Sequence, residues 1–271
     1  MSIVGCGRTG GAVGLALNRA GYTIAAAWSR SRAGRQRAHR LLDIPVLADP
    51  AEVAAAGEVV FVAVPDDAIG LMAEQITPGI RPRSRVVHTS GGTSIEVLRP
   101  ARDAGARTGS MHPLQTIPDA THGADALAGA AVAVTCAPED RLDLFRIARA
   151  WGGRPFVVAD DAKPRYHAAA VFASNFIVSS AWAAAALLRQ VGVRDTTAAL
   201  APLLRATVDN LIARGPEKAL TGPIVRRDAA TIRRHVDVLA ETEPEVLEAY
   251  RGLTRLTGHL AGFDDVVEEA L

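Results

Sequence analysis

The first 160 residues alternate short apolar runs with segments whose apolar residues recur at helical spacing. The runs are rich in Val, Ala and Ile without polar alternation, which predicts strands buried on both faces. Strands that alternate with helices predict a parallel, doubly wound sheet. The predicted strands are Ser2–Gly5, Thr23–Trp28, Glu58–Val64, Arg85–Thr89, Arg107–Met111, Ala130–Thr135 and Pro155–Ala159.

After about Asp161 the strand-like runs stop and helical patterns follow. We therefore predict an α/β fold, with a doubly wound domain over residues 1–160 and an all-α domain over residues 161–271. The apolar stretch around Val178 to Leu188 is too short and too weakly hydrophobic for a confident membrane span, so we expect a buried helix. The predicted helices are Pro164–Val191, Thr196–Arg214, Asp228–Glu241 and Pro244–Ala261, and Glu268-Glu269 is predicted to be a solvated tail.

Composition excludes several classes of protein. The 271 residues include 49% hydrophobic and 22% charged side chains, as in a globular protein, and the net charge is +1. That balance and the 4% aromatic content argue against a nucleic-acid partner, which needs basic and stacking side chains. Cys6 and Cys136 show no metal-type spacing and no signal peptide is visible. We expect a cytoplasmic protein with no metal and no membrane partner.

A glycine motif follows the first predicted strand and opens a helix. Gly5, Gly7 and Gly10 form a G-x-G-x-x-G pattern with Arg8 and Thr9 between them. In dinucleotide-binding folds, the first glycine makes a tight turn, the second lets a pyrophosphate approach the backbone, and the third packs helix on strand. Free N–H groups at the helix start then bind phosphate. A glycine-rich turn without a ligand is the alternative.

The end of the second strand bears on the choice of cofactor. An NAD site would place Asp or Glu there, whereas this chain has Ser29, Arg30 and Ser31. One charge-assisted hydrogen bond of about 1.5–3 kcal/mol to a 2′-phosphate would favour NADP by roughly 10- to 150-fold. A solvated basic loop is the alternative. Val64 and Pro65, after the third strand, are expected to contact the nicotinamide and its ribose, or to form a plain turn.

Polar residues also follow two later strands, where side chains point into the ligand crevice of an open α/β sheet. Ser90 follows the fourth strand, and His112, Gln115 and Thr116 follow the fifth. His112 can donate or accept a proton, Gln115 and Thr116 can bind a carboxylate or carbonyl, and Ser90 is expected to bind substrate. A buried, hydrogen-bonded histidine before a turn proline is the alternative for His112. His88 is expected to be structural.

The first helix of the second domain carries polar residues on one side. At about 100° per residue, Lys163, His167, Ala170 and Ser174 form a stripe, with Asn175 at its margin. Lys163 is one of only two lysines among 30 basic residues, and a lysine can lower its pKa and release a proton whereas arginine cannot. A reductase needs such an acid near the substrate carbonyl oxygen. We predict that Lys163 is the acid, that Ser174 and Asn175 orient it or the substrate, and that His167 binds substrate. A solvated lysine at a helix start is the alternative.

A polar turn lies between two later helices. Thr221 and Arg226 can bind a substrate carboxylate there. Equally, Arg226 and Asp228 can be ordinary charges near a helix start, with Asp228 as the N-cap.

These motifs together resemble bacterial proteins that join a Rossmann-like domain to a C-terminal domain of unknown function. The resemblance spans almost the whole chain, and it rests on Gly5–Gly10, His112–Thr116, Tyr166–Ala170 with Ala173–Asn175, and Leu220–Ile224. Arg227 stands where that family often has glycine. The wider group includes 6-phosphogluconate, 3-hydroxyisobutyrate and prephenate dehydrogenases, pyrroline-5-carboxylate reductase and ketopantoate reductase.

The resemblance implies roles for particular residues. Lys163 matches the acid of ketopantoate reductases and hydroxyisobutyrate dehydrogenases, but the asparagine expected one turn later is His167 here. His112-Pro113 is similar to the catalytic His-Pro of prephenate dehydrogenases. The resemblance thus implies an NADP-dependent oxidoreductase that reduces a small 2-oxo acid, with ketopantoate as the best candidate. It also implies a homodimer formed through the C-terminal helices.

Two other functions stay open. One is a prephenate-dehydrogenase-like oxidation with His112 as base, and the other is an NADP-binding sensor without turnover.

Overall fold

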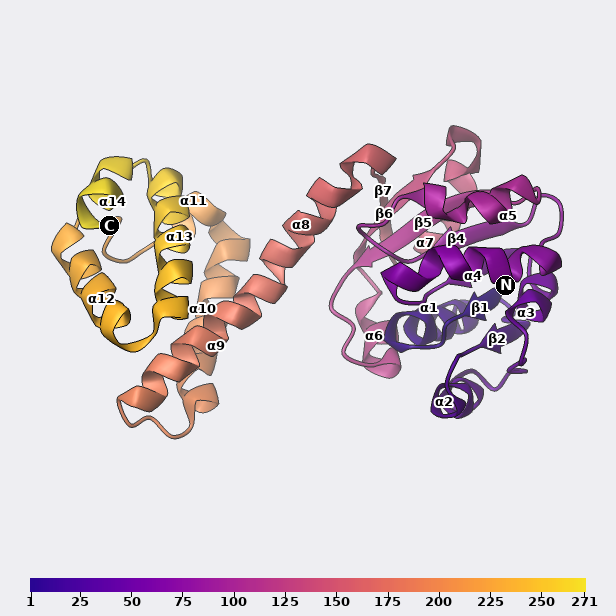
Figure 1. Ribbon diagram of the computed structural model, residues 1–271, viewed down its shortest axis with the longest axis horizontal. Coiled ribbons are helices and arrows are strands. Elements are labelled where there is room, and N and C mark those ends of the chain that lie inside the picture. Colours follow the sequence, from indigo (N-terminus) through magenta and orange to yellow (C-terminus); the bar gives the residue numbers. More distant parts are fainter. The chain divides into compact units, whose positions relative to one another are not determined.

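The computed structural model describes residues 1–271 except for the side chain of Thr242, and it forms two compact units (Figure 1). Met1–Asn175 is the sheet unit and Phe176–Leu271 is the helical unit. The sheet unit holds a seven-stranded sheet in the order β2-β1-β3-β4-β5-β6-β7, so the predicted α/β fold is confirmed. The strands are β1 (Ser2–Val4), β2 (Ala26–Trp28), β3 (Val59–Val62), β4 (Arg85–His88), β5 (Arg107–Leu114), β6 (Ala131–Cys136) and β7 (Arg154–Val157).

Helices cover both faces of this sheet, as the apolar strands predict. Neighbouring residues of one strand enter opposite cores: Ile3 belongs to a core shared with residues of α1, α2, α6 and α7, and Val4 to a core shared with residues of α3, α4 and α5. In β3, Phe61 likewise belongs to the first core and its neighbour Val60 to the second. These helices are α1 (Arg8–Arg19), α2 (Arg32–Leu42), α3 (Pro50–Ala56), α4 (Ile69–Ile76), α5 (Arg99–Asp103), α6 (Ala120–Ala126) and α7 (Arg141–Ala150), and short 3₁₀ turns include η1 (Asp66–Ala68) and η5 (Asp160–Ala162).

One strand departs from the predicted parallel sheet. β6 pairs antiparallel to β5, whereas every other neighbouring pair is parallel. Leu114, the last residue of β5, pairs with Ala131, the first residue of β6, and α6 between them packs on α1. A Cβ on Gly11 would come within 2.8 Å of Ala120 Cβ, so the two helices are in close contact. The chain therefore enters β6 from the edge at which β5 ended, and it runs back.

The helical unit confirms most of the predicted helices. α10 (Thr196–Arg214), α12 (Ala229–Thr242) and α13 (Pro244–Ala261) lie within two residues of their expected bounds. Asp228 caps α12, since its Oδ1 accepts from the Thr231 N–H at 3.0 Å. Glu268 and Glu269 are exposed, as predicted, but they lie in a helix, α14 (Asp264–Ala270), that buries Val266 and Val267. A short helix, α11 (Pro216–Ala219), completes this unit.

The first predicted helix after the sheet is divided in two. α8 (Lys163–Ala173) and α9 (Asn175–Gln190) are separated at Ser174, whose backbone leaves the helical region at φ −130° and ψ −73°. The boundary between the compact units falls after Asn175 rather than at residue 160, so α8 groups with the sheet. Side-chain contacts between α8 and the strands account for this shift, as described below.

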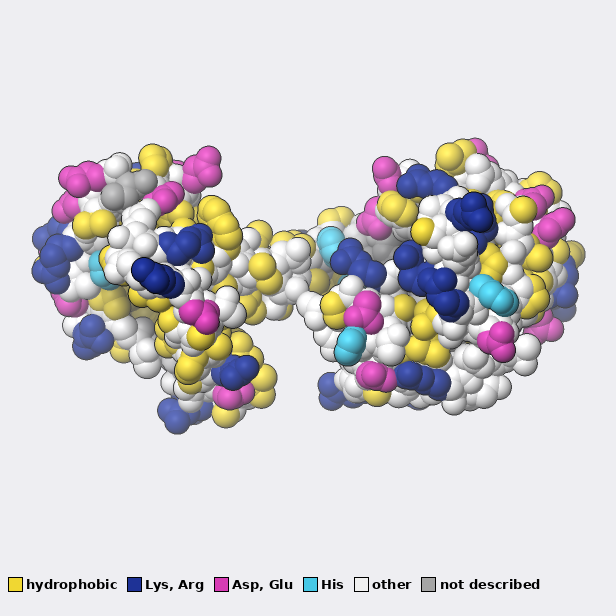
Figure 2. Space-filling view, turned by 90° about the horizontal axis from the view of Figure 1, so that it is seen from below, with side chains coloured by type: hydrophobic (Ala, Val, Ile, Leu, Met, Phe, Trp, Pro, Cys, Tyr) yellow, Lys and Arg dark blue, Asp and Glu magenta, His cyan; other side chains and the backbone are white. Residues whose placement is uncertain are grey.

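The expected burial of this apolar helix is not found. None of the residues of α9 is buried, and Val178 and Trp182 are 69% and 60% exposed. Figure 2 shows hydrophobic side chains over the visible face of the helical unit. Asp160–Gln190 is long and apolar enough to cross a membrane by length and composition, which is weak evidence for a span. Ala183 and Leu187 of α9 pack partly against Leu239, Val246 and Leu247, and a homodimer through these helices stays a prediction.

Candidate functional site

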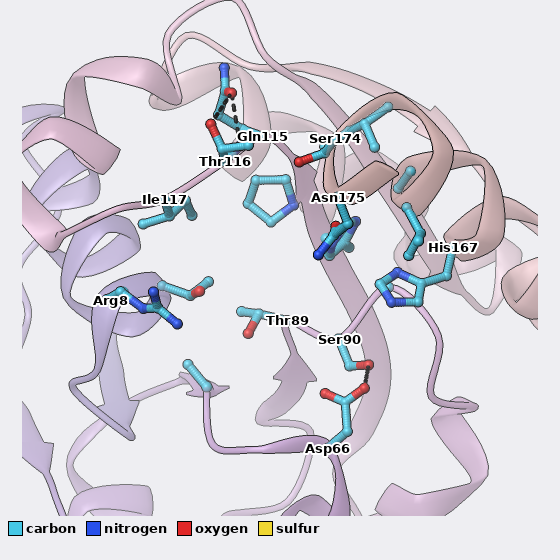
Figure 3. Close-up of a pocket in the computed structure, with 18 of the residues that line it drawn as sticks. Arg8, Asp66, Thr89, Ser90, Gln115, Thr116, Ile117, His167, Ser174 and Asn175 are labelled. Atoms are coloured by element: carbon cyan, nitrogen blue, oxygen red, sulfur yellow. Dashed lines mark hydrogen bonds between the residues drawn. The ribbon is translucent and has the colours of Figure 1, made fainter. Parts of the chain in front are cut away.

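A cavity of about 780 Å³ lies in the sheet unit, at the carboxyl ends of β3, β4 and β5 and beside α1 and α8 (Figure 3). This is the edge at which open α/β sheets bind ligands. Its lining brings together about half of the predicted site residues. They are Arg8, Thr9, Val64, Ser90, His112, Gln115, Thr116, His167, Ser174 and Asn175.

The three glycines of the motif differ in how closely other atoms surround them. Gly5 has φ +101°, and a Cβ there would lie 2.5 Å from the Ala63 carbonyl oxygen. A Cβ on Gly10 would lie 1.9 Å from the Gly5 carbonyl oxygen. A Cβ on Gly7 would meet no described atom within 4 Å. The fold therefore requires Gly5 and Gly10, whereas Gly7 leaves open space where a pyrophosphate would approach.

The start of α1 fits a dinucleotide. Its N-cap is Gly7, and no side chain of the described residues caps the helix. Arg8 points toward the cavity from this turn (Figure 3). Backbone N–H groups at a helix start attract phosphate, and a guanidinium adds a positive charge. These residues can hold the phosphates of a nicotinamide dinucleotide.

The Ser29–Ser31 loop lies beside the glycine turn, because β2 pairs with β1 and the Gly5 N–H donates to the Trp28 carbonyl at 2.9 Å. Arg35 Nη1 supports the loop by donating to the carbonyls of Ser29 and Arg30 at 3.1 and 2.9 Å. Ser31 Oγ caps α2, accepting from the Gly34 N–H at 3.0 Å. The loop itself carries no carboxylate, and Arg30 is exposed.

The third strand contributes one of its two predicted residues. Val64 lines the cavity, whereas Pro65 is absent from the lining and precedes η1. Asp66, the first residue of η1, also lines the cavity, and its Oδ2 accepts from Ser90 Oγ at 2.7 Å (Figure 3). The same oxygen accepts from Thr93 Oγ1 at 3.1 Å. Asp66 therefore fixes the turn after β4.

Lys163 lies beneath this turn rather than in the cavity lining. Its side chain is 2% exposed, and Nζ donates to the Ser90 carbonyl at 3.2 Å and to Ser110 Oγ at 2.8 Å. Burial lowers the pKa of Lys163 to about 8, although Asp160 and Asp66 oppose the shift. The solvated lysine considered above is thus excluded. Ser110, inside β5, is a site residue that the sequence did not single out.

His112 faces the cavity and is held on two sides. Its Nδ1 lies 2.6 Å from Tyr166 Oη, and a Cβ on Gly91 would approach its Cε1 to 2.9 Å. Burial lowers the pKa of His112 to about 4, with further lowering from His167 and Lys163 and opposition from Asp66. The imidazole is therefore neutral at physiological pH. Tyr166, which sequence reasoning left without a role, is its partner.

His88 is structural, as expected. It is fully buried, and its Nδ1 accepts from the Ser90 N–H at 3.1 Å. Burial lowers its pKa to about 4. The neutral ring shapes the turn on which Ser90 sits.

The polar stripe of α8 faces the cavity beyond Lys163. His167, Ser174 and Asn175 all line it, and His167 packs against Gly92, where a Cβ would lie 3.2 Å from the ring. Gln115 is partly engaged elsewhere: its Nε2 donates to the Ala126 carbonyl at 3.3 Å, and its Oε1 accepts from the Thr116 N–H at 2.8 Å.

Two predicted residues lie outside the sheet unit. Thr221 and Arg226 belong to the helical unit, between α11 and α12, and neither is among the lining residues of the cavity. Next to them, Arg227 has φ +56°, a conformation that glycine adopts most easily. The guanidinium of Arg227 stacks on Phe263 and pairs with Asp265 at 2.5 Å. Those contacts offset the strained backbone where the family often has glycine.

The glycine turn gives a paired prediction. The free energy of unfolding of Gly7→Ala should stay within about 1 kcal/mol of the wild-type value, because the new methyl group meets no other described atom. The same substitution should weaken NADPH binding at least tenfold. Gly10→Ala should lose about 3 kcal/mol or more of stability, because its Cβ overlaps a backbone oxygen. Urea unfolding and NADPH fluorescence titration measure both effects. Wild-type affinity in Gly7→Ala would show that phosphate binds elsewhere.

Lys163 gives a pH prediction. Between pH 8 and 10.5 the folded lysine has released a proton that the unfolded one keeps, so the unfolded state binds more protons and stability rises with pH. Relative to Lys163→Met, the wild type should gain up to about 3 kcal/mol of unfolding free energy across this window. Urea unfolding at several pH values tests this, with exposed Lys218→Met as the control. If the difference in unfolding free energy between wild type and Lys163→Met did not change with pH, that result would contradict a buried ammonium with a lowered pKa.

Two family models match successive parts of the chain. Residues 1–113 match the Rossmann-like domain, and residues 130–257 match the domain of unknown function DUF2520. A search of curated proteins gave no match.

Several solved structures share the fold. A Bacteroides fragilis protein assigned as an NADP oxidoreductase is 24% identical, with a TM-score of 0.80 and coverage of 97% of each chain. The reductive aminase of Aspergillus terreus, solved with NADPH and ethyl levulinate, is 20% identical, with a TM-score of 0.66 and coverage of 99% of this chain and 96% of its own. Prephenate dehydrogenase from Aquifex aeolicus is 14% identical, with a TM-score of 0.59 and coverage of 95% of this chain and 98% of its own. The chain thus belongs to the proteins that join a Rossmann-like domain to a DUF2520 domain, as the sequence motifs predicted.

Proposed function

We propose that the protein is an NADP-dependent oxidoreductase that reduces the carbonyl group of a small 2-oxo acid. One observation carries the proposal: the glycine turn, the Ser90 turn, His112 and the polar stripe of α8 converge on a single cavity of about 780 Å³. Pockets of a few hundred to a thousand Å³ accommodate small ligands. The oxidoreductase assignments of structural neighbours support the same class of reaction.

The cofactor half of the cavity supports NADP. Gly7 and the start of α1 would hold the pyrophosphate, with Arg8 and Thr9 alongside. Arg30 and Ser29, on a loop without a carboxylate, would bind the 2′-phosphate. When bound, NADPH supplies a hydride to the substrate carbonyl carbon.

The substrate half supplies hydrogen-bond donors and a proton. Hydroxyl and amide groups of Ser174, Asn175 and Thr116 line it and can bind a carboxylate. His112 faces the cavity, and we propose that it donates to the carbonyl oxygen. Lys163, immediately below Ser90, adds a positive charge that stabilises the developing alkoxide. Ketopantoate is the first 2-oxo acid to test.

A second candidate is the reverse chemistry, an oxidation like that of prephenate dehydrogenase. His112 lines the cavity as a neutral imidazole, and this form has a lone pair that can accept a proton.

Arg30→Ala should raise the KM for NADPH by roughly 10- to 150-fold, because one charge-assisted hydrogen bond is lost. The KM for NADH should stay within about twofold, since NADH has no 2′-phosphate. Initial rates with both cofactors measure this. Arg40→Ala, at the far end of α2, is the matched control, and equal effects of Arg30→Ala on the two cofactors would refute the NADP assignment.

Turnover tests the proposed reaction. NADPH oxidation with a panel of 2-oxo acids, ketopantoate included, should be saturable, and His112→Asn should lower kcat by about 100-fold or more. Tight NADPH binding without turnover of any acid would instead identify a sensor. Full activity in His112→Asn, with loss of activity in Lys163→Met, would identify Lys163 as the proton donor to the substrate oxygen.

A further inference from the structure

We infer that Tyr166 is a positioning residue that holds His112 in the tautomer with its proton on Nε2 and passes its own proton to Nδ1 as Nε2 protonates the substrate. The inference rests on the proposed function, in which His112 donates to the substrate oxygen. Neither the family match nor the motif analysis gives Tyr166 a role.

The contact between the two side chains is short and specific. Tyr166 Oη lies 2.6 Å from His112 Nδ1, a separation at which one of the two groups donates a hydrogen bond to the other. Among the described residues, His112 is the one hydrogen-bond partner of the Tyr166 hydroxyl. If Nδ1 carried the proton and donated, the phenol proton would be left without a protein acceptor.

Packing fixes both rings in this geometry. The ring of Tyr166 meets that of His112 edge-on, with centroids 5.5 Å apart, and Phe156 supports Tyr166 at 6.0 Å. Gly91 closes the other side of His112, since a Cβ there would come within 2.9 Å of the ring. The imidazole therefore cannot turn to offer Nδ1 to the cavity without losing these contacts.

The protonation states agree with this arrangement. Burial raises the pKa of Tyr166 to about 12, so the phenol keeps its proton at rest. The His112 pKa of about 4 leaves a neutral ring with one N–H. The charged or titratable groups facing that ring are His167 and Lys163 from α8 and Asp66 from η1. With Nδ1 accepting from Tyr166, the proton is on Nε2.

The proton transfers balance. As hydride reaches the carbonyl carbon, the carbon–oxygen π bond breaks and the oxygen takes the Nε2 proton. Nδ1 takes the hydroxyl proton of Tyr166, so the imidazole stays neutral. After the product leaves, Nε2 takes a proton from solvent in the cavity and Nδ1 returns its proton to the phenolate, which restores the starting tautomer with a net uptake of one proton per turnover. The Tyr166 pKa of about 12 makes this return favourable. An alkoxide is a stronger base than a phenolate, which gives the relay its direction.

The test replaces the hydroxyl alone. Tyr166→Phe should lower kcat by about 10-fold or more, with KM values within about twofold, because the proton transfer depends on the tautomer. In ¹⁵N NMR spectra of the protein without ligand, His112 should be an Nε2–H tautomer in wild type and a mixture in Tyr166→Phe.

Tyr250→Phe is the matched control, because it removes a hydroxyl 2.9 Å from Nδ1 of another histidine, His235, in the helical unit. An Nδ1–H tautomer in wild type, or an unchanged tautomer in Tyr166→Phe, would overturn the inference. If wild type reduced no 2-oxo acid, the proposed function would fail, while the NMR result would still decide the role of Tyr166.

Discussion

Two hydrogen bonds from one buried ammonium hold the site together. Lys163 donates to the Ser90 carbonyl after β4 and to the Ser110 hydroxyl inside β5, and so joins α8 to the sheet. Burying the charge is unfavourable, as the lowered pKa of Lys163 shows. In return, α8 is fixed at the carboxyl edge, where His167 and Ser174 complete the cavity. The boundary between the compact units after Asn175 follows from this attachment.

The same attachment organises the electrostatics of the cavity. The ammonium of Lys163 lies below the lining, and Asp66 is engaged by Ser90 and Thr93. His112 faces the cavity as a neutral imidazole because burial and nearby positive charge lower its pKa. A neutral donor beside a buried cation suits a reaction in which negative charge develops on a substrate oxygen.

Much of this could be predicted from the sequence. The strands were predictable because both faces are buried, so each is a continuous apolar run. The antiparallel direction of β6 was not, because it depends on how α6 packs against α1. Lys163 stood out by residue type and position. Ser110, however, is one small residue inside a strand. Tyr166 contacts His112 across a sequence separation of 54 residues, so only the tertiary structure brings these residues into view.

A crystal structure with NADPH and an unreactive 2-oxo acid analogue tests the central claim most directly. The account predicts the phosphates at Gly7 and the start of α1, with the analogue's carbonyl oxygen within hydrogen-bond distance of His112 Nε2. Phosphates bound away from the glycine turn, or an analogue bound out of reach of His112, would contradict it.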